Sequence, residues 1–161
     1  MFTKTLFQTL FAYQWHIDSR LLDLAAQLDE ADYKEQPGYG KGSIHDLLFH
    51  LMRALNNWRQ GMETGERRYS LKAEDFQTLE AIKAGLQLEH FAWDSTLEKL
   101  SVEDIEGDVS LTRRSGDVEN IPRWRILQHL VLHGMQHHAE LAHLLTLKGK
   151  SPGDIDFIFF S

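Results

Sequence analysis

Four long segments of the chain repeat their apolar residues every three or four positions, which is the period of an amphipathic helix. The first runs from Thr3 to about Leu28 and lacks the alternation of a strand. Its apolar face consists of Leu6, Leu10, Tyr13, Ile17, Leu21, Leu24 and Leu28. The other three segments cover residues 44–62, 73–100 and 122–147. The pattern predicts an all-α protein, a four-helix bundle in which one long connection crosses between helices two and three or three and four.

The segments outside these helices carry their own signals. Ser43 stands where a helix cap is expected, with Asp46 three residues later. Residues 29–42 are rich in glycine and predict a loop, and residues 101–120 predict a polar linker with room for a small hairpin. The C-terminal residues 154–160 are too apolar to remain in water. We expect this tail to pack on the bundle or on a second subunit.

The length and composition of the chain exclude several kinds of site and disfavour several kinds of partner. With 161 residues the chain has the size of one domain, and we assign residues 1–161 to it. It contains no cysteine, so thiolate metal sites and cysteine nucleophiles are excluded. A net charge of −7 argues against a nucleic-acid or anionic-membrane partner. Because no apolar run approaches a membrane span and the N-terminus does not resemble a signal peptide, we expect a cytoplasmic protein.

Histidine is in marked excess over one part of the chain. Five of the nine histidines lie within residues 129–143, where even spacing would put about 0.8. A projection at 100° per residue places His133 and His137 inside the apolar stripe of the last helix. On the second helix, His50 also faces the core. The other histidines and one carboxylate are expected outside it: His138 and His143 on the flanks, His129 and Glu140 at the border, and His45, His16 and His90 in solvent, with no assigned role.

Three core-facing imidazoles on two helices need a common explanation, because a buried ring nitrogen without a partner costs free energy. Histidines four residues apart on one helical face can reach one metal ion, and a third imidazole from a facing helix completes the set. We therefore predict that His50, His133 and His137 bind a divalent metal, with open positions for water or substrate. Zinc and nickel are expected first, and iron and copper are the alternatives. The other interpretation is that these are ordinary hydrogen-bonded core histidines; Glu140 is a candidate to orient one of the rings.

Several ordered pieces of the sequence resemble the DinB/YfiT-like family of four-helix metalloproteins. They are Tyr13-Gln14-Trp15, the run from Ser43 to Leu51, the run from His129 to His138, and the closing Pro152-Gly153-Asp154-Ile155-Asp156-Phe157. The resemblance covers nearly the whole chain. It implies an up-down-down-up bundle, usually paired into a homodimer, in which one histidine of helix two and two of helix four bind the metal near one end. These positions correspond here to His50, His133 and His137.

The resemblance also suggests a chemistry. Some relatives, the bacillithiol S-transferases and mycothiol-dependent enzymes such as maleylpyruvate isomerase, use the metal to activate a low-molecular-weight thiol. Where the family commonly has Arg-x-Gln after the second ligand of helix four, this chain has His138-Ala139-Glu140, so the polar surroundings of the site differ.

Two functions follow from the sequence. The first is a metal-dependent enzyme, an S-transferase or hydrolase, that activates a small thiol or water for attack on a small-molecule substrate. The second is a non-catalytic, dimeric, stress-associated protein with a structural or regulatory metal. Nucleic-acid binding gains no support from the charge or from any motif.

Overall fold

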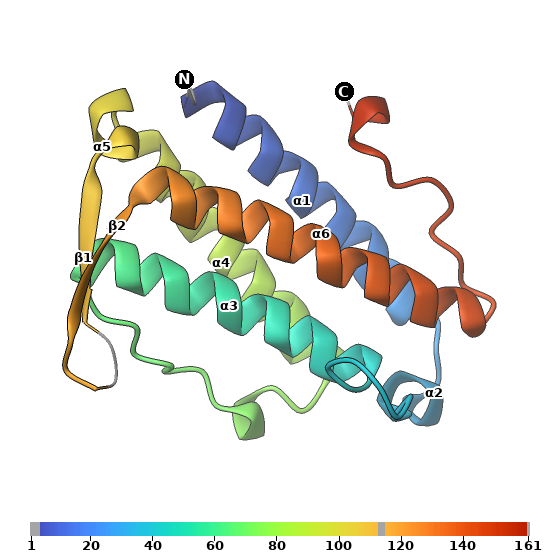
Figure 1. Ribbon diagram of the computed structural model, residues 1–161. Coiled ribbons are helices and arrows are strands. Elements are labelled where there is room, and N and C mark those ends of the chain that lie inside the picture. Colours follow the sequence, from blue (N-terminus) through green and yellow to red (C-terminus); the bar gives the residue numbers. More distant parts are fainter. Residues whose placement is uncertain (1–3, 113–114, 161) are drawn as a thin grey trace.

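The computed structural model describes residues 4–112 and 115–160. Four of the described helices have 21 to 25 residues, and the long helices pack side by side as a bundle (Figure 1). The elements in chain order are α1 (Lys4–Ala25), α2 (Glu30–Lys34), α3 (Ile44–Thr64), η1 (Ala73–Asp75), α4 (Leu79–Lys99), α5 (Val102–Glu106), β1 (Asp108–Thr112), β2 (Val118–Pro122), α6 (Arg123–Leu147) and η2 (Phe157–Phe159). The predicted all-α architecture is confirmed. Within the described ranges, every helix is too short or too polar to cross a membrane.

Each long helix packs between two neighbours. Helix α1 contacts α6 and α4, and α3 contacts the same two helices from the opposite corner. Figure 1 shows that α3 and α4 run in the same direction while α1 and α6 run opposite to them, which is the up-down-down-up order. Two successive helices that run in the same direction need a connection as long as the bundle. Residues 65–78 provide it, so the crossing connection lies between the second and third long helices.

Helix α1 buries a wider face than the one that the sequence pattern predicts. Phe7 and Phe11 are 0% and 2% exposed, whereas Leu6 is 39% exposed. Tyr13, Ile17 and Leu21 are buried as expected, and Leu10, Leu24 and Leu28 pack at the edge of the core. The reason is the corner position of α1. A helix that faces both α4 and α6 buries two adjacent stripes of side chains. The sequence pattern identified only one of them.

The ends of the helices follow local capping chemistry. Ser43 and Asp46 form a complete capping box at the start of α3, and Gly65 ends that helix in the left-handed conformation. Helix α4 begins at Leu79, later than the predicted residue 73, because the side chain of Thr78 caps it. The predicted loop 29–42 contains the short helix α2, whose first turn is capped by Asp29.

The segment before α6 contains the predicted hairpin. Strands β1 and β2 pair antiparallel, with Ser110 opposite Asn120. Val109 and Leu111 point from β1 into the core, at 6% and 4% exposure. The hairpin thereby closes one end of the bundle (Figure 1).

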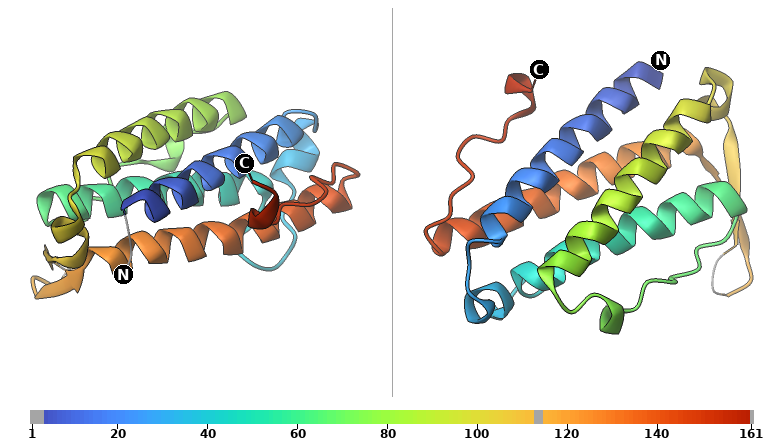
Figure 2. Two further views of the ribbon diagram at one scale, coloured as in Figure 1. Left: turned by 90° about the horizontal axis from the view of Figure 1, so that it is seen from above. Right: turned by 180° about the vertical axis from the view of Figure 1, so that it is seen from behind.

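The C-terminal tail packs on α1. Of the two predicted locations, the bundle and a second subunit, the structure shows the first. The ring of Tyr13 contacts Phe157 and Phe160, with centroids 5.2 and 5.6 Å apart, and Arg20 Nη1 donates a hydrogen bond to the carbonyl of Asp154 at 2.8 Å. Both views in Figure 2 show the tail beside α1. Ile158 and Phe159 remain 81% and 72% exposed, so the packing covers only part of the tail.

Candidate metal centre

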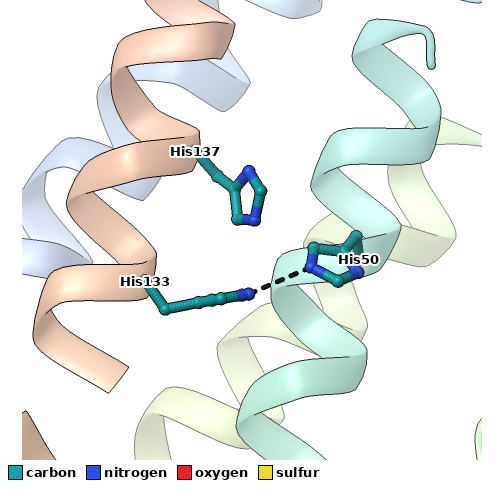
Figure 3. Close-up of side chains that lie close together, drawn as sticks. All are labelled: His50, His133 and His137. Carbon is teal, nitrogen blue, oxygen red and sulfur yellow. Dashed lines mark hydrogen bonds between the residues drawn. The ribbon is translucent and has the colours of Figure 1, made fainter. Parts of the chain in front are cut away.

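Three histidines from two facing helices meet inside the bundle. His50 projects from α3, and His133 and His137 project from successive turns of α6 (Figure 3). One nitrogen from each ring lies within 4.8 Å of the others. The Nε2 atoms of His50 and His133 are 3.0 Å apart. The structure therefore brings together all three residues that the sequence selects.

A carboxylate fixes the orientation of the most buried ring. His137 is 1% exposed, and its Nδ1 lies 2.9 Å from Oε2 of Glu140, one turn further along α6. A carboxylate can only accept, so Nδ1 carries a proton, and in the neutral ring Nε2 is the atom that can bind a metal. Glu140 thus has the orienting role that its place at the border of the stripe suggests.

Burial keeps the other two rings neutral. Loss of water around the ring, together with the nearby His137, lowers the pKa of His50 to about 4. The same two causes lower the pKa of His133 to about 3. At neutral pH both imidazoles are uncharged, and their nitrogens are available as lone-pair donors.

This donor set fits a borderline transition metal. Neutral imidazoles without thiolate suit zinc, nickel, copper or iron better than magnesium or calcium. Two nitrogens that share one tetrahedral ion lie roughly 3.4 Å apart. The observed 3.0 Å between His50 and His133 is therefore close to the spacing of a ligand pair, and three protein ligands leave at least one coordination position open.

The three histidines lie on an open cleft of about 360 Å³. Lys41, Arg53, Trp58 and His129 also line it. His129 is exposed at the border of the stripe, as predicted, and its ring packs against Trp58 with centroids 5.2 Å apart. A small molecule can therefore reach the cluster directly from solvent.

A buried polar cluster beside the site was missed by sequence reasoning. His138, expected on a flank, is 1% exposed, and its Nε2 lies 2.7 Å from Oδ1 of Asp18. His90 was expected in solvent, but its side chain is only 12% exposed. It approaches the other oxygen of Asp18 at 2.8 Å and stacks on Trp15, with ring centroids 4.0 Å apart. Three helices meet at this carboxylate. The available signal was that Asp18 lies four residues after Gln14 and directly follows Ile17 of the predicted apolar face.

Two of the remaining histidines lie where the sequence predicts them, and one does not. His16 and His143 are exposed, as predicted. His45 was expected to be solvated, but its side chain is only 12% exposed, and its Nε2 lies 2.9 Å from the carbonyl of Phe76. The connection between α3 and α4 covers this side of the helix, and a projection of α3 alone does not include that segment.

Comparison with known proteins agrees with the fold. A crystal structure of the DinB-like protein YjoA from Bacillus subtilis superimposes with a TM-score of 0.65 at 16% sequence identity, over 87% of this chain and 92% of that one. No curated protein sequence matches the chain. The family model described as the DinB family matches residues 1–161. The chain belongs to the DinB family.

Proposed function

We propose that the protein binds one divalent transition metal through His50, His133 and His137, and that it is a metal-dependent enzyme acting on a small molecule. The observation that carries the proposal is the position of the cluster: three imidazole nitrogens within 4.8 Å of one another, on an open cleft of about 360 Å³. A bound ion would act there as a Lewis acid that lowers the pKa of a thiol or a water molecule.

The residues of the chain define the rest of the chemistry. Glu140 holds His137 in one tautomer, and burial keeps His50 and His133 uncharged, so the set is ready to bind a cation. The chain has no cysteine. A thiol nucleophile would therefore have to come from a small molecule that enters the cleft, and a bound ion could instead activate water, which supports an S-transferase or a hydrolase.

Metal binding is tested on protein without a histidine tag. Elemental analysis and titration with zinc, nickel or cobalt should give one ion per chain. His50→Ala and His133→Ala should lose it. The matched control is His143→Ala, an exposed position on the same helix as His133, which should retain full binding. Equal binding by His133→Ala and His143→Ala would refute the proposed ligand set.

Activity is tested on the cobalt form, whose visible spectrum reports changes around the ion. We expect the spectrum to change when a small thiol or an electrophile is added. A stoichiometric ion whose spectrum responds to neither would favour the second candidate, a dimeric protein with a structural or regulatory metal.

The second candidate rests on a different observation. Leu88 and Phe91 lie three residues apart on α4 and are 70% and 75% exposed, which suits contact with a second copy of the chain. Sedimentation of the wild type and of Leu88→Ser/Phe91→Ser tests this. Loss of both the dimer and the fold when the metal is removed would support it, because a structural ion contributes to folding.

A further inference from the structure

The cleft in front of the three histidines has an uneven charge. Lys41, Arg53 and Arg67 line it, and among the residues that the structure describes its lining includes no aspartate or glutamate. Glu140, which contacts His137, lines a separate cavity. The whole chain carries a net charge of −7. The charge of the cleft lining is positive and is therefore opposite in sign to the net charge of the protein. Such a local field attracts anions.

Arg67 is held in place on both sides. Its guanidinium lies 4.0 Å from the ring centroid of Trp58 and 5.2 Å from that of Tyr69. Before it, Glu66 forms a β-bridge with Thr112. After it, Ser70 donates a hydrogen bond to Asn56 on α3. The arginine is therefore fixed over the aromatic ring.

Two further features show that the backbone accommodates this arrangement. A Cβ at Gly61 would lie 3.0 Å from Cγ of Arg67, so the glycine leaves room for the arginine stem. Tyr69 adopts a φ of 50°, a left-handed conformation that residues other than glycine seldom adopt. Backbone strain of this kind is concentrated at functional sites.

The cleft also contains polar atoms without a partner in the described protein. The Nε of Arg67 is buried and has no hydrogen-bond acceptor. Asn57, which is 3% exposed and belongs to the lining of the same cleft, has a buried Oδ1 without a partner. Buried polar groups are normally satisfied, so a donor and an acceptor left open in one cleft indicate a ligand that supplies both partners.

We infer that Arg67 and Asn57 form a subsite for a small organic carboxylate that also carries a hydroxyl or amino group. The carboxylate accepts from the edge of the Arg67 guanidinium, which matches its planar geometry, and the donor of the ligand bonds to Oδ1 of Asn57. Lys41 and Arg53 supply the surrounding positive field. This inference rests on the proposed function, because it names the class of substrate that the metal site would receive.

The test uses mandelate, which has a carboxylate, a hydroxyl and an aromatic ring, and its neutral analogue mandelamide. Calorimetric titrations are carried out on the metal-free protein, so binding does not depend on the ion. We expect mandelate to bind at least about tenfold more tightly than mandelamide, as a charge-assisted hydrogen bond implies. Arg67→Gln should weaken mandelate binding by a similar factor.

The matched control is Arg68→Gln, which removes the same charge one residue away. Arg68 is outside the cleft lining and lies 3.6 Å from Glu66, so this variant should bind mandelate within about twofold of the wild type. An independent readout is the NMR signal of the Arg67 Nε–H group in the wild type, which should shift on addition of mandelate. This measurement decides the question even if Arg67→Gln folds poorly.

Several results would overturn the inference: no binding of mandelate, equal binding by the Arg67→Gln and Arg68→Gln proteins, or an unshifted Nε–H signal. Phosphate that bound more tightly than mandelate would also overturn the carboxylate assignment. Metal titration separates these failures from the proposed function. Arg67→Gln should still bind one ion, and the metal-free wild type should still bind mandelate.

Discussion

Asp18 on α1 and His138 on α6 form a buried pair, with 2.7 Å between Oδ1 and Nε2 and side chains that are 3% and 1% exposed. The second oxygen of Asp18 contacts His90 on α4. One carboxylate therefore joins three of the four long helices. His138 directly follows His137, so the same contact fixes the rotation of α6 that presents His133 and His137 to α3.

The first prediction concerns the stability that this carboxylate supplies. Asp18→Asn removes the charge that His90 and His138 share and leaves a buried donor without a good acceptor. We expect a loss of about 2–3 kcal/mol in the free energy of unfolding at pH 7, measured by urea denaturation. The control is Asp23→Asn on the same helix, whose side chain is 68% exposed and pairs with Lys83. It should cost less than about 1 kcal/mol.

The second prediction is the pH dependence of that stability. The contacts of Asp18 with His138 and His90 outweigh its burial and lower its pKa to about 2. A carboxyl whose pKa is lower in the folded state stabilises the fold above its unfolded pKa of about 3.9, and the stabilisation is lost as the pH falls towards 2. The contribution is about 2–3 kcal/mol at neutral pH, and about half of it is lost by pH 3.

The measurement compares unfolding curves of the wild type and Asp18→Asn between pH 6 and pH 3. The difference between the two proteins should be constant down to about pH 5 and should then shrink. A difference that stays constant to pH 3 would show that the pKa of Asp18 is the same in the folded and unfolded states, so that its contacts with His138 and His90 do not lower it.

The third prediction follows from the contact between Glu140 and His137. Glu140→Ala removes the acceptor that fixes the His137 tautomer, so the ring loses its preferred orientation. We expect the affinity for zinc to fall about 10- to 100-fold, with little change in the far-UV circular dichroism spectrum. Glu106→Ala, an exposed carboxylate on α5, is the control and should bind zinc as the wild type does. Unchanged affinity in Glu140→Ala would mean that packing alone orients His137.

The sequence was sufficient for the parts of the fold and the site that depend on one helix at a time. The period of apolar residues located the four long helices, and projection selected His50, His133 and His137. The helical projection failed where a helix packs against two neighbours and buries two faces. His138 was assigned to a flank because its angle from His133 is wide, but α6 packs on both α3 and α1, and the second face is also buried. Asp18 was missed for the same reason.

Arg67 illustrates a different limit. It lies in the connection between α3 and α4, where no periodic pattern applies, and its position depends on the bridge between Glu66 and Thr112. That bridge joins residues 46 positions apart in the chain. Contacts of this kind arise from the assembled fold, and no motif of the sequence identifies them.

The last prediction concerns the close approach of α1 and α6 beside the histidines. A Cβ at Gly134 would lie 2.0 Å from Oε1 of Gln14, whose Nε2 donates to the carbonyl of Val131 at 2.7 Å. In an open helix, Gly→Ala stabilises by about 1 kcal/mol. Here the alanine must displace a buried and hydrogen-bonded side chain, so we expect Gly134→Ala to destabilise the protein by about 1–3 kcal/mol.

A double-mutant cycle with Gln14→Ala isolates this contact. Once the amide is removed, the alanine at position 134 has room, and the same Gly134→Ala change should become neutral or stabilise by up to about 1 kcal/mol. Urea unfolding of the four proteins measures the coupling. A cost that is equal in both backgrounds would place the clash on another part of α1, and the glycine would then serve a contact other than the one with Gln14.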